Sequence, residues 1–361
     1  MSSIAKKQGK EKRGGCNLEG KSCWVGVDVH KVSYAVAIRD EEGQELSFST
    51  PAIPNKLLLQ LLAMGINITA LTYESGPTGY GLAWACQDAG VNVLVVAPSR
   101  VPRPISKTGK TDRLDSEKLA EFLARDMLTS IAIPTRDEFA LRELERMRQL
   151  WVKKRREVRQ HIHAFLLRNG LAEPHGLDYW STAAYQALQK MDLPPWLRQV
   201  LDFYLEEHAH VLACLAKVTK QLEMATIALG HGEQINNLRT IPGVGATIAH
   251  TFTAEIFSPE RFKKAEQICA FVGLAPITSH SGSGKEKAWT RPVGQRYLRS
   301  ILVQAAWKLI SSDGYYREYY NRIRNKTGVF QKAITAVARK LLVLIWRIAI
   351  ERRPYRPVEA Q

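Results

Sequence analysis

Four acidic residues in the first third of the chain are spaced so that they can share one metal site. Asp28 lies in a predicted strand, Glu74 ends another strand, and Asp112 and Asp115 open a predicted helix. The last two are three residues apart and therefore lie on one helical face. Carboxylates brought together repel one another, and a divalent cation relieves this repulsion. Oxygen ligands of this kind suit Mg²⁺, with Mn²⁺ as the alternative, rather than zinc.

Such a site suits phosphoryl transfer, in which two ions about 3.5–4 Å apart can activate the attacking oxygen and stabilise the leaving one. Each residue also has a simpler explanation when it is taken singly. Asp28 would then be a polar residue at a sheet edge, Glu74 a strand cap and Asp112 a helix N-cap. The order of the predicted strands favours the shared metal site.

A second candidate group lies in the C-terminal third, where Ser279, Ser281 and Ser283 stand on a Gly-rich segment. A serine flanked by glycine is sterically accessible, and neighbouring cations would stabilise a phosphate or an oxyanion. The residues alone favour a flexible polar loop over a nucleophile. The residues alone do not distinguish among the three serines.

Basic residues accompany both groups and are predicted to hold a phosphate backbone beside the reacting atoms. For the basic residues beside Asp112 and Asp115, a solvated loop is the competing explanation. The predicted nucleic-acid-binding residues are Lys107, Lys110, Arg113, Lys285, Arg296 and Arg299.

The elements that must position the acidic residues form an α/β domain. Three strands in a meander, predicted over 25–29, 34–38 and 46–49, are followed by α, β, α, β and α elements. This is the order of an RNase H-like domain, in which the first and fourth strands are neighbours. Helix residues Leu57, Leu58, Leu59, Leu61 and Leu62 are expected to supply a buried face. The continuously apolar segment 91–96 is expected in the middle of the sheet.

A long helical region follows the α/β domain. Leu144, Trp151, Val158 and Phe165 recur every seven residues, which predicts a coiled-coil-like helix with a basic outer face. Arg148 and Arg155 fall near the apolar seam, so packing within the chain competes with dimerisation. A second helical stretch, 196–229, is expected to return antiparallel to the first, and the segment after residue 232 is predicted to be mainly helical.

The composition favours a polyanionic partner, because 51 Lys and Arg against 35 Asp and Glu give a net charge of +16. An acidic membrane surface is the alternative. The five cysteines include no C-x-x-C pair, and the N-terminus has no apolar secretory segment. The apolar run 341–350 is too short to span a bilayer. These features predict a cytoplasmic protein without a membrane partner.

Taken together, the motifs resemble those of the DEDD transposases of the IS110 type and the related Piv-type DNA invertases. The motifs that carry the resemblance are Gly26–Lys31, Tyr73–Tyr80, Lys110–Asp115, Ile241–Gly245, Glu255–Ile256, Arg261–Phe262, Gly273–Pro276, Ser281–Gly282 and Leu298–Arg299. They occur in family order and bracket the chain from about residue 24 to 350.

The resemblance implies a RuvC-like (RNase H-like) domain, a helical coiled-coil segment and a mainly α C-terminal transposase domain. The implied bounds are a basic tail over 1–22, then domains over 23–130, 131–232 and 233–361. It also gives the four acidic residues a catalytic, metal-binding role and makes Ser281 the nucleophile that forms a phosphoserine with DNA.

The partners that the resemblance implies are donor and target DNA, a structured bridge RNA as guide, and further copies of the chain. A dimer or tetramer would form composite active sites, because the acidic domain of one subunit serves the serine of another. The implied location is the bacterial cytoplasm, at the nucleoid. Two alternatives remain at this point: a site-specific invertase with the same chemistry, and a metal-dependent, structure-selective nuclease.

Overall fold

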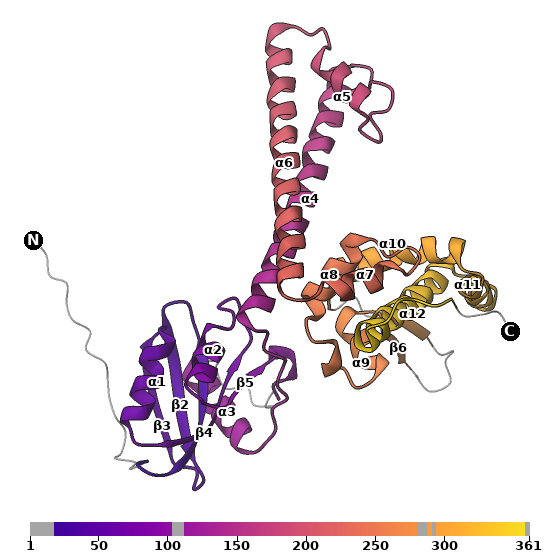
Figure 1. Cartoon of the computed structure of the whole chain (residues 1–361). Coiled ribbons are helices and arrows are strands. Elements are labelled where there is room, and N and C mark those ends of the chain that lie inside the picture. Colours follow the sequence, from indigo (N-terminus) through magenta and orange to yellow (C-terminus); the bar gives the residue numbers. More distant parts are fainter. Residues whose placement is uncertain (1–17, 103–111, 280–286, 291–293, 358–361) are drawn as a thin grey trace, which may run out of the picture. The chain divides into compact units, whose positions relative to one another are not determined.

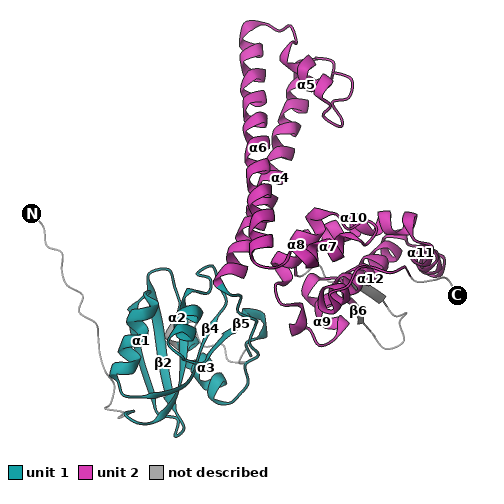
Figure 2. Ribbon diagram, viewed as in Figure 1, with its two compact units in different colours: residues 1–135 teal, residues 136–361 magenta. Residues whose placement is uncertain are grey.

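The computed structural model describes residues 18–102, 112–279, 287–290 and 294–357. The chain divides into two compact units, residues 1–135 (unit 1) and 136–361 (unit 2), shown in Figure 2. The predicted further boundary at residue 232 remains a prediction.

Unit 1 is built on a five-stranded mixed sheet of order β3-β2-β1-β4-β5 (Figure 1). β1 pairs antiparallel with β2 and parallel with β4, so the first and fourth strands are neighbours, as the RNase H-like order predicts. The elements of unit 1 are β1 (Ser22–Val29), β2 (Ser33–Asp40), β3 (Glu45–Pro51), α1 (Pro54–Ala63), β4 (Asn67–Glu74), α2 (Gly81–Asp88), β5 (Val93–Val96), a 3₁₀ turn (Pro98–Arg100) and α3 (Asp112–Ala124).

Two expectations about unit 1 were wrong. Strand β5 lies at the edge of the sheet and not in its middle. It is apolar throughout because its residues pack into two different apolar clusters, Val95 with the helix residue Cys86 and Val96 with Leu119 of α3. In helix α1, Leu57, Leu58 and Leu61 are buried, whereas Leu59 and Leu62 are 68% and 59% exposed. The i, i+1, i+4 spacing of the buried three defines one face, and Leu59 and Leu62 point away from it.

Unit 2 begins with a hairpin of two long helices, α4 (Arg136–Arg168) and α6 (Pro195–Ala228), with the short α5 (Thr182–Gln189) between them. The heptad residues Val158 and Phe165 share an apolar cluster with Leu201 and Leu205 at the start of α6. Leu144 packs near the end of α6, so the two helices run antiparallel, as expected. The apolar stripe is therefore covered within the chain, and association between copies stays a prediction.

The rest of unit 2 is mainly helical and packs around α12 (Phe330–Glu351), which is buried along most of its length (Figure 1). A two-stranded antiparallel sheet accompanies these helices. The other elements are α7 (Gly232–Arg239), α8 (Ala246–Ile256), a 3₁₀ turn (Pro259–Arg261), α9 (Ala265–Val272), β6 (Pro276–Ser279), β7 (Lys287–Thr290), α10 (Arg296–Ser312) and α11 (Gly314–Thr327). In the described part of the chain, no helix is long and apolar enough to cross a membrane.

The helical hairpin contains a buried histidine that makes its stability depend on pH. His208 is 2% exposed, its ring lies 4.6 Å from that of Trp180, and its Nε2 accepts a hydrogen bond of 3.1 Å from Arg159. Burial first, and then the charges of Arg159 and Arg155, lower the pKa of His208 from 6.5 to about 4. Between about pH 4 and pH 6.5, His208 therefore binds a proton in the unfolded chain but not in the folded chain. Stability is therefore lost as the pH falls through this window.

We expect the free energy of unfolding to fall by up to about 3 kcal/mol between pH 7 and pH 4.5 on account of His208. Urea titrations followed by tryptophan fluorescence measure it. The His208→Gln variant keeps a hydrogen-bond acceptor without a titratable ring, so its curve should be shallower than that of the parent. Because the other titrating groups are common to both proteins, parallel pH curves would contradict the prediction.

Candidate active site

Asp28 and Glu74 lie on the same face of the sheet, at the carboxyl ends of neighbouring parallel strands. The last paired residues of β1 and β4 are Val27 and Tyr73, both fully buried on the opposite face. Since side chains alternate along a strand, the next residue of each strand points to the other side. Both carboxylates are half-buried, with 25% of the Asp28 side chain exposed.

Helix α3 covers this face and carries the other two acidic residues in its first turn. The helix comes so close at Gly26 that a Cβ there would lie 2.2 Å from the carbonyl oxygen of Ser116 and 2.4 Å from the amide nitrogen of Ala120. Further along α3, Leu123 packs with Trp24 near the start of β1. The helix therefore runs antiparallel to β1, and Asp115 lies toward the end of the strand that carries Asp28.

Basic side chains lie beside two of these carboxylates. His30 Nε2 is 3.1 Å from Asp28 Oδ2, and Lys118 Nζ is 3.9 Å from Asp115 Oδ1. Neither residue was predicted to belong to the site. The i, i+3 spacing of Asp115 and Lys118 was a usable signal for the second contact. His30 lies beyond the end of its strand, where alternation no longer fixes the direction of a side chain.

Within the described residues, no group of three or more His, Cys, Asp or Glu side chains is placed to hold a metal ion. The helix begins at Asp112, but the side chains of Asp112 and Arg113 lie outside the described residues, as do Lys107 and Lys110. The structure thus places three of the four predicted acidic residues, Asp28, Glu74 and Asp115, around one face of the sheet.

The predicted serine group belongs to unit 2. Ser281 and Lys285 lie outside the described residues. Arg296 and Arg299 lie in the first turn of α10, where Arg296 is exposed and Arg299 is half-buried.

A buried ion pair within α4 is hydrogen-bonded to the start of α10, and it was not predicted from the sequence. Glu145, which is fully buried, accepts two hydrogen bonds of 2.9 Å from Arg148 and one of 2.6 Å from Thr251 of α8. Arg148 also donates to the hydroxyl of Tyr297 at 3.3 Å. Arg148 had appeared only as a flaw in the heptad pattern. Its burial is possible because the bidentate carboxylate satisfies the guanidinium.

Comparison with known proteins finds two family models. A transposase model of the DEDD, IS110 type matches residues 25–169, and a model described as "Transposase IS116/IS110/IS902 family" matches residues 235–321. A putative transposase of Sinorhizobium fredii is 28% identical over 92% of this chain and 90% of its own length. The transposase of insertion sequence element IS1328 from Yersinia enterocolitica is 24% identical over 84% of this chain and 86% of its own.

These matches and the acidic sheet face define the class: the protein is a DNA transposase, an enzyme that acts on DNA. The chain belongs to the IS110-type family of DEDD transposases. DEDD transposases typically depend on a divalent metal. A shorter match is the pilin gene-inverting protein of Moraxella bovis, which is 32% identical over 37% of this chain and 42% of its own length.

Proposed function

We propose that the protein cleaves and rejoins DNA strands of an insertion sequence through a phosphoserine formed on Ser281, with metal assistance from the acidic face of unit 1. The observation that carries the proposal is the placement of Asp28, Glu74 and the first turn of α3 around one face of the sheet, in a chain of the IS110-type family. The RNase H-like (RuvC-like) fold, the coiled-coil segment and the separate C-terminal transposase domain belong to the same proposal.

The donors on this face fit a hard divalent cation, because Asp28, Glu74 and Asp115 are all carboxylates. Together with Asp112 they would hold Mg²⁺, with Mn²⁺ as a substitute. When bound, the cation supplies charge stabilisation for a phosphate that is being transferred. Lys107, Lys110 and Arg113 precede or belong to the first turn of α3 in sequence, and we assign them to the DNA backbone.

The serine chemistry conserves the phosphodiester. Ser281 Oγ forms a bond to a DNA phosphorus atom, one bridging P–O bond breaks, and the released DNA oxygen takes up a proton as a hydroxyl. Attack by a hydroxyl of another strand then reverses the step, regenerates the serine and joins the new strand. Lys285, Arg296 and Arg299 would hold the phosphate during both steps.

The proposal includes a structured guide RNA and a homo-oligomer with composite active sites. The surplus of 16 positive charges supports a large polyanionic partner. A second candidate function, site-specific DNA inversion with the same chemistry, is favoured by the similarity to the pilin gene-inverting protein. RNA that co-purifies with the protein distinguishes the two, because a single discrete species supports guidance and its absence favours the invertase.

The chemistry is tested by trapping the covalent intermediate. The protein is incubated with Mg²⁺ and a labelled DNA that carries a nick beside the cleavage site, so that the released strand diffuses away. We expect a labelled adduct on a denaturing gel, and mass spectrometry of its peptides should place the nucleotide on Ser281. An adduct on Ser279 or Ser283 would move the nucleophile, and cleavage without any adduct would leave a metal-dependent nuclease.

A further inference from the structure

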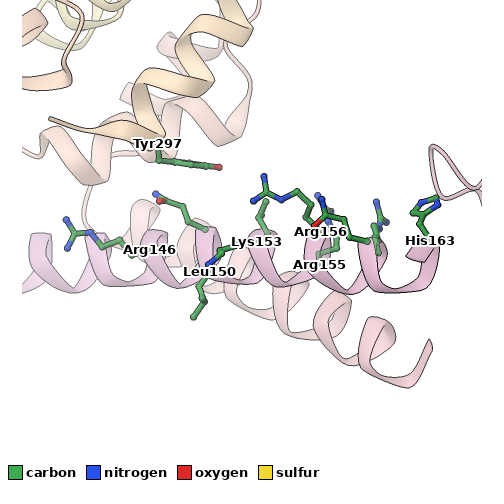
Figure 3. Close-up of a pocket in the computed structure, with 11 residues that line it drawn as sticks. Arg146, Leu150, Lys153, Arg155, Arg156, His163 and Tyr297 are labelled. Atoms are coloured by element: carbon green, nitrogen blue, oxygen red, sulfur yellow. The ribbon is translucent and has the colours of Figure 1, made fainter. Parts of the chain in front are cut away.

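Helix α4 forms one wall of a basic groove that the proposed chemistry does not use. A cavity of about 740 Å³ lies along the helix, with Tyr297 of α10 on its other side (Figure 3). Its charged lining residues are Arg146, Lys153, Arg155, Arg156 and Arg159. No acidic side chain is among the described residues that line it.

The groove follows a regular row of polar side chains on α4. Their spacing alternates between three and four residues, which keeps them on one line along a helix. The row extends over about 25 Å, given a rise of 1.5 Å per residue. Its members are Arg146, Gln149, Lys153, Arg156, Gln160 and His163. The apolar stripe toward α6 is a separate row. At the end of the basic row, His163 contacts the segment between α4 and α6, through Glu173 at 2.7 Å and the ring of Trp180.

The positive charge of the groove is only partly neutralised. Arg146 lies 3.1 Å from Glu255, and Lys153 lies 3.5 Å from Glu157. In the part of the chain that the structure describes, no ion pair involves Arg155 or Arg156. After burial, the charge of Arg155 is the next cause that lowers the pKa of Arg159. Like charges held together in this way favour an anionic ligand.

The size and the aromatic wall of the groove favour one strand over a duplex. Figure 3 shows the Tyr297 ring facing the row of α4 side chains. Grooves that bind single strands combine cations along the backbone with aromatic rings on which bases stack. A cavity of 740 Å³ is of the size that encloses a drug-sized molecule, which is about two nucleotides of a single strand and too small to enclose a duplex.

We propose that this groove binds a single strand of DNA, with phosphates along the α4 row and a base against Tyr297. DNA is the strand that the family's reaction requires, because strand exchange separates paired strands. The inference rests on the transposase activity of the family and not on Ser281 or on the metal site. A binding measurement without metal therefore tests it independently of the proposed chemistry.

The test is fluorescence anisotropy of a labelled 12-nucleotide DNA with the full-length protein in EDTA, over a range of salt concentrations. The groove variant is Arg155→Gln/Arg156→Gln. The matched control is Lys154→Gln/Arg168→Gln, which removes the same charge from exposed residues of α4 that do not line the groove. We expect affinity in 0.1 M salt to fall roughly tenfold for the groove variant, with the salt slope reduced by about 1.4.

Tyr297 supplies a second readout that does not depend on charge. Tyr297→Leu should weaken binding about tenfold, whereas Tyr297→Phe, which keeps the ring, should bind like the parent. The proposal is overturned if the groove and control variants bind alike, or if the two Tyr297 variants do. It is also overturned if a duplex or an RNA of the same length and sequence binds more tightly than the DNA strand. Thermal melting of each variant shows that the loss is not one of folding.

Discussion

Replacing Ser281 by alanine is expected to reduce DNA strand exchange at least about a thousandfold while DNA binding is kept. Without the hydroxyl there is no atom on which the phosphate can be held between cleavage and rejoining, and removal of a nucleophile costs factors of this size or more. The measurement is recombination on a plasmid that carries the two ends of the element, with binding followed separately by gel shift.

Ser279→Ala and Ser283→Ala are the matched controls, because each removes one hydroxyl from the same segment. Both should retain activity within a few-fold of the parent. If Ser281→Ala exchanges strands normally and one of the controls does not, the nucleophile has been assigned to the wrong serine. If all three are active, the phosphoserine proposal fails.

A companion variant, Asp112→Asn, separates the metal contribution from the serine. The amide keeps the size of the side chain and removes one negative charge, so the cation would be held less well. We expect activity to fall at least about a hundredfold, with the adduct and the final product lost together. Normal activity in Mg²⁺ would remove Asp112 from the metal site.

The sheet of unit 1 was predictable because its pattern has few alternatives. The meander is defined by strands with alternating apolar and polar residues and by a turn after Asp40. A helix that begins at Pro54 then provides the crossover to the next strand. The handedness and shortness of such connections then place the fourth strand beside the first. The position of β5 was not predictable from its apolar run, because an edge strand covered on both faces has the same composition as a central one.

The candidate site was predictable as a set of residue types but not as a set of contacts. The neighbouring strand ends that carry Asp28 and Glu74 follow from strand order alone. The contact of His30 with Asp28 depends on a side-chain direction that no sequence period fixes. The i, i+3 spacing of Glu145 and Arg148 indicates that the two can pair, but not that the pair is buried. The groove along α4 needed the fold, because Tyr297 is 138 residues beyond Arg159 in the chain and only packing brings it opposite the basic row.

Gly26→Ala is expected to destabilise the protein by about 3 kcal/mol and to reduce strand exchange about a hundredfold. The added Cβ would lie 2.2 Å from a backbone oxygen and 2.4 Å from a backbone nitrogen of α3, so no side-chain movement can relieve the contact. The helix must shift by about 1 Å, and overpacking of this kind costs 1–3 kcal/mol or more. Because α3 carries Asp112 and Asp115, the same shift displaces both from Asp28, and a misplacement of this size lowers catalysis by about two orders of magnitude.

Gly81→Ala is the matched control, since a Cβ at this first residue of α2 would meet nothing within 4 Å. It should leave activity unchanged and should not lower stability, because alanine is the better helix former. Urea unfolding and plasmid recombination measure the two effects of each variant. A Gly26→Ala protein with parental stability would mean that α3 does not pack this closely on β1. A destabilised variant with full activity would mean instead that the first turn of α3 does not have to stay beside Asp28 for the reaction. Gly26 would then matter for folding and not for the site.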